Sequence, residues 1–515
     1  MEGRVTLIAV LAAAFLAAAQ ASEQQPDAAA PAPVESVYIE ELERAVALAE
    51  TGDCAGALDI LLPALQSPDY ASRLPDSAAR AHETVVDCAI KERRWLDALA
   101  SIEAHLALAG ESERMLWFQL HVANLADRPL AGLAATERFV KRAPRMLSEV
   151  ELQVIFSLLG KLKDTPEGDK RLAFLDLLWD AGYKPADPAA SLDGLRMAYA
   201  RLLTAEHMTA RAARLIREID SSLAVTTFLI DRSFDPVRIF KGLPDEKDLP
   251  ALVAAEVEKS LRATREHPAL LAVSLNYIQA LRLSGAFEDA EKAAAETAAA
   301  MGETAEESAY EDYDEYAAWI LNEWAYSLYD LGRNDEARAA LARAADKDEH
   351  GASNVSQRIN LSSMLHAQER HAEALTEIAK LDASTMNPYG VMWAKAVTVC
   401  ARAFQNRLGE ASDDLAYLKE HKADNMSALQ RTLFCVNDLD AAAALYIERL
   451  EDPDQRGAAL NALQAALSPP YTPPVTAELH KRFETVRARP DVREAAEKVG
   501  RILSLPFYPT YWGDI

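Results

Sequence analysis

Glycine is scarce in this sequence, with 19 copies among 515 residues. Sharp β-turns depend on glycine, so the chain has little of what β-hairpins require. Alanine, the residue with the highest helix propensity, is abundant along the whole chain. Half of the residues (50%) are hydrophobic, which excludes a wholly disordered protein and allows a continuous buried seam. The composition therefore predicts an all-α fold.

Basic residues are also in short supply, because 54 Lys and Arg stand against 80 Asp and Glu and give a net charge of -26. A field of this sign repels nucleic acid and anionic lipid head groups, so neither is expected as a partner. The acidic balance excludes these partners more than it names one. A protein or peptide partner remains compatible with it, including a basic one.

Long apolar runs are lacking except at the N-terminus, where residues 5–19 are almost unbroken in hydrophobicity. The run follows Arg4 and ends in the small-x-small pattern at Ala21 that signal peptidase reads. At roughly 15 residues it is shorter than the ~20 that a membrane-spanning helix needs. We therefore expect a signal peptide over 1–21 and a periplasmic or secreted mature protein without a membrane span, with an uncleaved anchor as the alternative. The first cysteine is Cys54, which argues against a lipid anchor.

Residues 22–35 are rich in Ala, Pro and Gln without an apolar period, which is typical of a flexible tether. From residue 36 onward the pattern becomes helical. Apolar residues recur every three or four positions on both sides of a break at residues 51–53, which predicts a helix-turn-helix hairpin. A small residue early in each helix lets the pair cross closely, and glycine ends the first helix in a left-handed turn.

The hairpin recurs along the chain, each time with a small residue as an anchor in its second helix. The spacing of these anchors brackets the period of about 34 residues that is typical of tetratricopeptide repeats (TPRs). With its degenerate copies, the sequence resembles the TPR family. The resemblance implies an α-solenoid, a quasi-linear stack in which each hairpin contacts its neighbours and the concave face binds a protein or peptide. The anchors are Ala57, Ala98, Gly132, Ala290, Ala337, Ala374, Ala411 and Ala442.

The helical rhythm stops at residues 221–250, where a β-branched apolar run is followed by prolines. We expect an irregular junction there, between an N-terminal helical array over 36–220 and a C-terminal TPR-like array over 251–468. Residues 469–515 begin with a proline-rich break, which must be extended because a residue before proline avoids the helical region. Closing helices and an aromatic tail follow, and the tail is expected to cap an exposed seam of the array, with anchoring of a partner as the alternative. Its aromatic residues are Phe507, Tyr508, Tyr511 and Trp512.

The sequence shows no recognisable motif for catalysis or metal binding. His82-Glu83 begins a zinc-protease-like string, but Val86 stands where the second histidine is required. His366 and His371 are five positions apart, which would place them on different faces of a helix. The sequence therefore predicts no catalytic residue, no metal and no cofactor. It favours a non-catalytic scaffold or adaptor for protein–protein or protein–peptide interaction. The alternative is a helical-solenoid cell-wall enzyme such as a peptidoglycan lyase, whose catalytic glutamate would leave no motif.

The helix predicted over residues 309–331 carries a second, aromatic stripe beside its packing face. In the TPR fold the first helix of each hairpin lines the concave groove, so the resemblance implies a peptide-binding role for this stripe. Asparagine amides there can pair with both donor and acceptor of a bound backbone. The alternative is packing between repeats, which burial of the stripe's last two tyrosines would favour. The groove candidates are Tyr316, Trp319, Asn322, Tyr326, Tyr329, Asn276 and Asn360.

An acidic segment, residues 303–315, directly precedes the stripe. It would steer a basic peptide toward a groove. The alternative is a solvated helix start, where carboxylates interact favourably with the helix dipole.

Four cysteines in an exported chain favour two disulfides. Cys54 and Cys88 are about one repeat apart, and so are Cys400 and Cys435, so each pair should fall on neighbouring hairpins. Pairing across the two sets would require the solenoid to close on itself. Packed helices lie some 8 to 10 Å apart, whereas a disulfide needs Cα atoms within about 7 Å, so small offsets in register decide whether the bonds form. The alternative is four buried thiols.

Overall fold

The structure, a computed structural model, describes residues 33–348 and 354–509. Within these ranges every regular element is an α-helix or a 3-10 helix, beside two isolated β-bridges. The prediction of an all-α fold is confirmed. The expected signal peptide, most of the tether, and Tyr511 and Trp512 of the tail lie outside the described residues. None of the described helices is both long enough and apolar enough to cross a bilayer.

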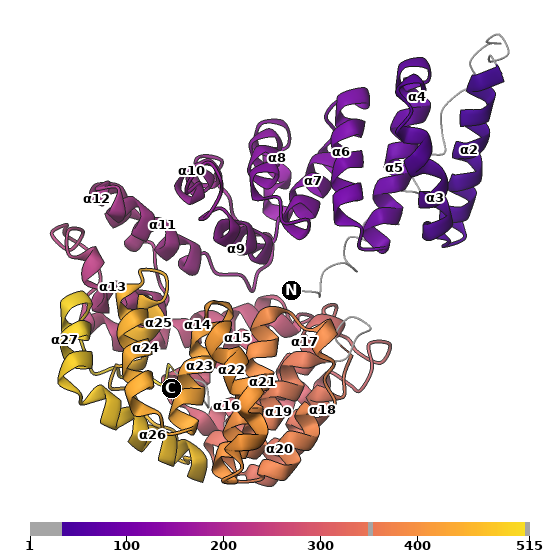
Figure 1. Cartoon of the computed structure of the whole chain (residues 1–515). Helices are drawn as coiled ribbons and strands as arrows, with labels where there is room; N and C mark the ends of the chain where they lie inside the picture. Colours follow the sequence, from indigo (N-terminus) through magenta and orange to yellow (C-terminus); the bar gives the residue numbers. More distant parts are fainter. Residues whose placement is uncertain (1–32, 349–353, 510–515) are drawn as a thin grey trace. The chain divides into compact units, whose positions relative to one another are not determined.

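The chain divides into two compact units, with the boundary between Ala190 and Ser191. In the first unit each helix packs on its neighbours in the chain, so that hairpin follows hairpin (Figure 1). Its elements are α2 (Pro33–Glu50), α3 (Cys54–Leu65), α4 (Pro68–Arg73), α5 (Pro75–Lys91), α6 (Trp95–Ala109), α7 (Glu113–Leu125), α8 (Pro129–Arg142), η1 (Pro144–Glu149), α9 (Leu152–Lys161) and α10 (Arg171–Asp180).

The turn between α2 and α3 shows how the hairpins are built. Gly52 adopts a left-handed φ of 90°, and Oδ1 of Asp53 accepts a hydrogen bond from the Gly56 N–H at 2.9 Å, which caps α3. Farther along, α8 approaches α9 so closely that a Cβ on Gly132 would lie 2.9 Å from Leu158 Cδ1. All eight repeat anchors are buried, so the small residues do allow the helices to approach each other closely.

The second unit continues the series of hairpins and is larger (Figure 1). Its first elements are α11 (Asp193–Ala205), α12 (Thr209–Ile216), α13 (Ser222–Ile230), η2 (Arg232–Phe234), η3 (Glu246–Asp248), α14 (Leu249–Glu266), α15 (Leu271–Ser284), α16 (Phe287–Ala300), α17 (Tyr313–Asp330) and α18 (Asn334–Ala345). The later elements are α19 (Val355–Ala367), α20 (His371–Ile378), η4 (Ala383–Thr385), α21 (Pro388–Phe404), η5 (Leu408–Ala411), α22 (Ser412–Glu420), η6 (Lys422–Asp424), α23 (Met426–Cys435), α24 (Leu439–Glu451), α25 (Arg456–Ala462), α26 (Pro474–Arg487) and α27 (Pro490–Val499).

The segment expected to be an irregular junction begins as a helix, α13. The Ser221 hydroxyl accepts a hydrogen bond from the Ala224 N–H at 3.4 Å and caps this helix, in which Val225 and Ile230 are buried. β-branched residues lower helix propensity only slightly, and burial in the core outweighs that preference. The irregular stretch is therefore confined to the residues between η2 and η3. The boundary between the two compact units lies earlier in the chain, between Ala190 and Ser191.

The second unit closes on itself. The backbone N–H of Arg501, just after α27, donates to the carbonyl of Ile230, at the end of α13, at 2.8 Å. Nε of Arg232 donates to the carbonyl of Glu497 at 2.8 Å, and Asp231 forms an antiparallel bridge with Gly500. Contacts in this unit are therefore not limited to neighbouring hairpins, as a quasi-linear stack would have them. Pairing between residues more than two hundred positions apart leaves no local pattern, so the sequence could not reveal it.

Both cysteine pairs lie at disulfide distance, in the pairing expected from the repeats. Cys54 and Cys88 join α3 to α5 with a Cα–Cα distance of 4.8 Å. Cys400 and Cys435 join α21 to α23 with a Cα–Cα distance of 5.0 Å. Offsets in register thus bring each pair closer than the usual separation of packed helices.

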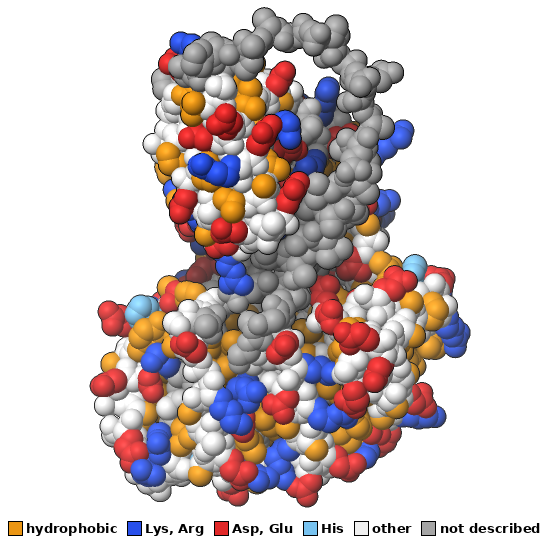
Figure 2. Space-filling view, turned by 90° about the vertical axis from the view of Figure 1, so that its right-hand side faces the viewer, with side chains coloured by type: hydrophobic (Ala, Val, Ile, Leu, Met, Phe, Trp, Pro, Cys, Tyr) orange, Lys and Arg blue, Asp and Glu red, His pale blue; other side chains and the backbone are white. Residues whose placement is uncertain are grey.

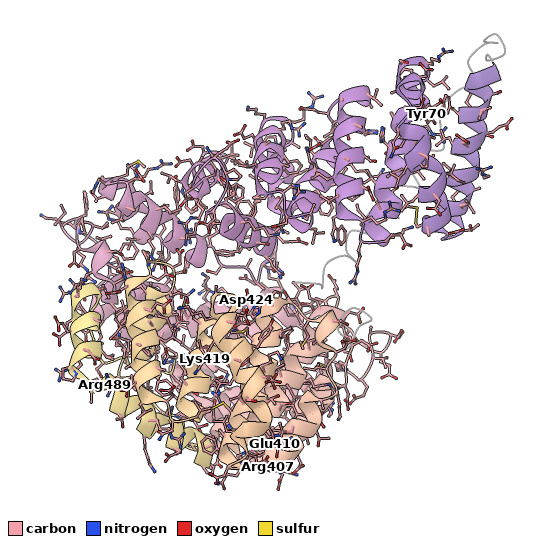
Figure 3. The ribbon with its side chains drawn as sticks, in the orientation of Figure 1. Tyr70, Arg407, Glu410, Lys419, Asp424 and Arg489 are labelled. Carbon is pink, nitrogen blue, oxygen red and sulfur yellow. A yellow bond between two sulfur atoms is a disulfide. The ribbon has the colours of Figure 1, made fainter. Side chains whose placement is uncertain are left out.

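Acidic and basic side chains are interspersed on the face that Figure 2 shows. Many are paired locally. Arg407 Nε and Glu410 Oε1 lie 2.5 Å apart near the start of a repeat's second helical segment (Figure 3). Exposed ion pairs of this kind stabilise a helix by roughly 0.3 to 0.5 kcal/mol each. The Arg-x-x-acid spacing is therefore a recurring sequence feature of the repeats that contributes little to their stability. The same spacing forms Arg94–Asp97, Arg333–Glu336 and Arg370–Glu373.

Candidate functional site

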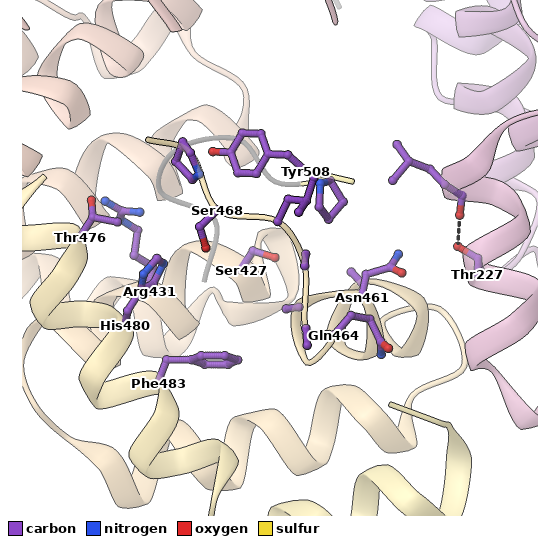
Figure 4. Close-up of a pocket in the computed structure, with 18 of the residues that line it drawn as sticks. Thr227, Ser427, Arg431, Asn461, Gln464, Ser468, Thr476, His480, Phe483 and Tyr508 are labelled. Atoms are coloured by element: carbon purple, nitrogen blue, oxygen red, sulfur yellow. Dashed lines mark hydrogen bonds between the residues drawn. The ribbon is translucent and has the colours of Figure 1, made fainter. Parts of the chain in front are cut away.

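A pocket with a volume of about 990 Å³ lies in the second unit. Helices from the beginning, middle and end of this unit contribute to its wall, namely α11, α13, α17, α21 and α23 to α26. Residues 464–473, which follow α25, and residues 508–509 of the tail complete the wall. Figure 4 shows Ser468 and Tyr508 on these two C-terminal segments, with Arg431 and His480 to one side of them. Closure of the unit is what brings these distant segments around one space.

The two C-terminal segments are held by backbone hydrogen bonds. The N–H of Tyr471 donates to the carbonyl of Asp330 at 3.0 Å, and the N–H of Tyr508 donates to the carbonyl of Leu283 at 2.8 Å. The segments also bond to each other, through the Leu467 N–H and the Phe507 carbonyl at 3.1 Å. The proline-rich break has no helical or 3-10 structure, as expected for residues that precede proline. It lies against α17, where the Tyr329 and Tyr471 rings meet edge to face.

The described part of the aromatic tail packs against repeats near the start of the TPR-like array. Phe507 is fully buried, and the Tyr508 ring lies 5.5 Å from the ring of Phe287 in α16. The tail therefore covers apolar surface, as the capping prediction requires. The surface belongs to α15 and α16, far from the last repeat in sequence.

One wall of the pocket is cationic although the chain as a whole is acidic. Arg431 of α23 and Arg449 of α24 are 5% and 3% exposed, and Arg487 of α26 lines the same space. Nη2 of Arg449 donates to the Ser427 hydroxyl at 3.1 Å. Buried guanidinium groups are costly unless hydrogen-bonded or paired. Both buried arginines also interact within the protein, and their positive charges make this wall favourable for a negatively charged group.

The three acids that line the pocket, Asp193, Asp330 and Glu484, are all paired, and Glu484 accepts from Arg487 of the cationic wall at 3.0 Å. Asp330 accepts from Arg282 at 3.0 Å. Asp193 accepts from Arg196 at 2.8 Å and from the backbone N–H of Ser221 at 2.8 Å. Burial raises the pKa of both carboxyl groups, and the hydrogen bonds to Arg282 and Arg196 oppose this effect. The negative charges are thus compensated within the wall.

His480 and a set of aromatic rings complete the pocket. Burial lowers the pKa of His480, and the charge of Arg431 acts in the same direction while Glu484 opposes it. The ring is therefore neutral near pH 7 and can either donate or accept a hydrogen bond. Tyr389 is 57% exposed, whereas Trp393 is partly buried. Apolar faces beside a few polar groups are the usual composition of a ligand site.

The groove predicted along α17 is not open at most of its residues. Asn322, Tyr326 and Tyr329 are 1%, 6% and 1% exposed. The Arg282 guanidinium of α15 lies over the Tyr326 ring, and the Tyr471 segment covers Tyr329. The prediction that these three side chains line an exposed peptide groove is therefore wrong, because the neighbouring repeat and the C-terminal segment cover them. Of the predicted residues, only Tyr329 contributes to the pocket.

The other groove candidates lie at the edges of this buried stripe. Trp319 is 36% exposed, and Tyr316, Asn276 and Asn360 are half-buried. Nδ2 of Asn360 donates to Oδ1 of Asn322 at 2.9 Å, so these two amides join α17 to α19. The acidic segment 303–315 forms the connection before α17 and its first turn, and Glu303 pairs there with Arg343 at 2.9 Å.

His366 and His371 do not lie on different faces of one helix. His366 is near the end of α19, His371 begins α20, and their Nδ1 atoms are 3.0 Å apart across the turn. Burial lowers the pKa of His366 well below its ordinary value, and Arg431 and His371 add to the effect. The expectation failed because a turn, rather than a continuous helix, separates the two histidines.

The stacked helical hairpins make this chain a TPR-like α-solenoid. No protein-family model matches the sequence, and no curated protein matches it significantly. Solved structures that are similar include the APC/C hetero-tetramer Cut9-Hcn1, at 14% identity with 90% of each chain covered and a TM-score of 0.27. Another is Naa15/Naa10 bound to HypK-THB, at 11% identity with 90% of this chain and 79% of that chain covered and a TM-score of 0.22.

Proposed function

We propose that this protein is a non-catalytic scaffold or adaptor that captures a segment of a partner protein in the pocket of its second unit. The observation that carries the proposal is the pair of buried arginines, Arg431 and Arg449, on the wall of a cavity of about 990 Å³. A carboxylate of the partner, at its C-terminus or on an acidic side chain, would accept charge-assisted hydrogen bonds there. The exposed Tyr389 and the half-buried Trp393 would contact apolar side chains beside it.

The net charge of the chain supports a partner whose surface is basic outside the segment that carries the inserted carboxylate. At a net charge of -26, long-range attraction would raise the rate of association with a basic protein, while the local pocket selects the inserted group. Two disulfide-distance cysteine pairs support an oxidising compartment, and we propose the periplasm as the site of action. N-terminal sequencing of the exported protein tests this part, since a mature chain that begins at Ser22 is expected.

Binding of synthetic peptides to the whole protein tests the pocket. The probes are a library of fluorescent peptides with terminal and side-chain carboxylates, together with the same peptides in amide form. Arg487 lines the pocket, pairs with Glu484 at 2.8 Å and is accessible enough to replace. Because Arg487→Gln removes one cation and leaves Glu484 without this partner, it should weaken carboxylate binding about tenfold, which corresponds to ~1.4 kcal/mol. Arg493→Gln, on an exposed position of α27 outside the pocket, is the matched control. Equal binding of carboxylate and amide peptides would contradict the proposal.

The alternative function, a cell-wall lyase, requires a compact catalytic domain in addition to the solenoid. Such a domain needs on the order of 100 to 150 residues. Within residues 33–348 and 354–509, the long segments are all helical hairpins and their connections. Incubation of the purified protein with peptidoglycan distinguishes the two functions, because release of soluble fragments is expected only from the lyase.

A further inference from the structure

A histidine and two cysteines of the second unit meet in its core. His366 of α19, Cys400 of α21 and Cys435 of α23 place one ring nitrogen and both sulfur atoms within 4.8 Å of one another. Each of the three residues is at most 3% exposed. No other group of three or more possible ligands from His, Cys, Asp and Glu is so arranged among residues 33–348 and 354–509.

The two nitrogens of His366 have different surroundings. Its Nδ1 lies 3.0 Å from Nδ1 of His371, so a hydrogen bond between the rings fixes the orientation of the imidazole. Its Nε2 is buried and has no hydrogen-bond partner. A buried polar atom normally has a partner, and an orphan requires an explanation. A metal-binding histidine commonly has this arrangement, with one nitrogen held by a hydrogen bond and the other directed at the ion.

We propose that reduction of the Cys400–Cys435 disulfide converts this cluster into a zinc site, with two thiolates and Nε2 of His366 as ligands. Thiolate and imidazole are the ligands that Zn²⁺ prefers, at about 2.3 Å to sulfur and about 2.0 Å to nitrogen. In a tetrahedral site these bond lengths separate the ligand atoms by roughly 3.5 to 3.8 Å. The disulfide bond holds the two sulfur atoms closer together than this, so they must move apart after reduction. The separations required by zinc still lie within the 4.8 Å that now spans the three ligand atoms. Water completes the fourth position.

The redox step needs a thiol reductant, which the protein does not itself contain. Two molecules of a small thiol reduce the disulfide, form one external disulfide and leave two cysteine thiols. Zn²⁺ then binds as both thiols lose their protons, and two protons are released. In the reverse direction an external disulfide oxidises the two thiolates, the bond between Cys400 and Cys435 forms again, and the ion leaves with two external thiolates. Bonds, electrons and charge balance in each direction.

The local charges require both thiolates. Arg431, a buried cation, lies one turn before Cys435 on α23. A cation bound by the imidazole alone would be repelled, whereas two thiolates contribute two negative charges. The oxidised protein should therefore not hold the ion. The other pair, Cys54 and Cys88, belongs to no such cluster with a histidine and provides an internal control.

Metal titration of the whole protein tests the proposal. We expect the reduced protein, kept under argon, to bind one equivalent of Co²⁺ with the absorption of a thiolate-bound ion, and Zn²⁺ to displace it. The oxidised protein should bind none. His366→Asn should weaken binding at least tenfold, and Cys54→Ser/Cys88→Ser should leave it unchanged. Retention of the ion by Cys400→Ser/Cys435→Ser, or equal binding before and after reduction, would overturn the proposal.

A second measurement needs no variant to fold. The reduced wild-type protein is treated with an alkylating reagent, with and without Zn²⁺, and each cysteine is followed by mass spectrometry. Zn²⁺ should protect Cys400 and Cys435 at least tenfold and leave Cys54 and Cys88 unaffected. If all four cysteines react equally with and without the ion, the zinc site does not exist, whatever the stability of the reduced chain.

Discussion

Arg282 and Asp330 form a buried ion pair in the second unit, with Arg282 Nε donating to Asp330 Oδ2 at 3.0 Å. Their side chains are 5% and 2% exposed. The same guanidinium donates through Nη1 to Oε2 of Glu323 at 2.9 Å, and it lies 5.2 Å from the centre of the Tyr326 ring. One arginine of α15 thus donates hydrogen bonds to two carboxylates of α17 and lies over the Tyr326 ring of that helix.

Replacement of this arginine should destabilise the second unit strongly. Arg282→Gln leaves Glu323 and Asp330 buried without their cation, which costs about 3 to 5 kcal/mol of unfolding free energy. Hydrogen-exchange mass spectrometry of peptides from α15 and α17 measures the loss. Arg262→Gln, at an exposed position of α14, should change stability by less than about 0.5 kcal/mol.

Adding Glu323→Gln and Asp330→Asn to the Arg282→Gln variant should restore part of the lost stability, because neutral amides are cheaper to bury than unpaired charges. If the single Arg282→Gln variant exchanges like the wild type, the ion pair does not stabilise α15 and α17.

His82 of the first unit should make stability depend on pH. Burial lowers its pKa from 6.5 to about 4, and His105 adds to the shift. Between these two values the unfolded chain takes up a proton that the folded chain does not, so stability falls as the pH falls from 6.5 to 4. The contribution is on the order of 1 kcal/mol after allowance for partial solvent access.

Urea unfolding at a series of pH values measures this contribution. His82→Leu should lose less stability than the wild type between pH 6.5 and 4. His267→Leu, at an exposed histidine, should follow the wild type. Parallel pH curves for His82→Leu and the wild type would show that His82 is not the group responsible.

Two helical glycines of the first unit differ in the space around them. A Cβ on Gly132 would approach Leu158 Cδ1 to 2.9 Å, whereas a Cβ on Gly160 would have no atom within 4 Å. Gly160→Ala should therefore stabilise the unit by roughly 0.5 to 1 kcal/mol, because alanine loses less backbone entropy in a helix. Gly132→Ala should gain less or destabilise, since the Leu158 side chain must shift to make room for the new Cβ. Thermal unfolding of the two variants compares them, and an equal gain in Tm would show that the α8–α9 contact is not tight.

Removal of the tail should lower the melting temperature. A chain that ends at Leu505 loses the buried Phe507 and the hydrogen bond from the Tyr508 N–H to the Leu283 carbonyl. Loss of one buried aromatic side chain costs about 3 to 5 kcal/mol. Differential scanning calorimetry measures the change, with removal of the last three residues alone as the control. An unchanged melt would indicate that the tail serves a partner rather than the fold.

Local features of this protein could be predicted from the sequence, because the forces behind them act between near neighbours. The break around Gly52 and the small anchors such as Ala57 and Ala98 define each hairpin through helix periodicity and close packing. The pairing of Cys54 with Cys88 follows from the same period. An extended backbone at the proline-rich break follows from the steric restriction on residues before proline.

Only the tertiary structure decided how the second unit closes and what closure buries. The bond between Arg501 and Ile230, the cover of Tyr329 by Tyr471, and the meeting of His366 with two cysteines all join residues from separate repeats. Amphipathic helices show which faces are apolar, but they do not show which distant segment will cover them. The pocket and its arginines therefore depend on long-range packing, in which many weak contacts together select one closed arrangement.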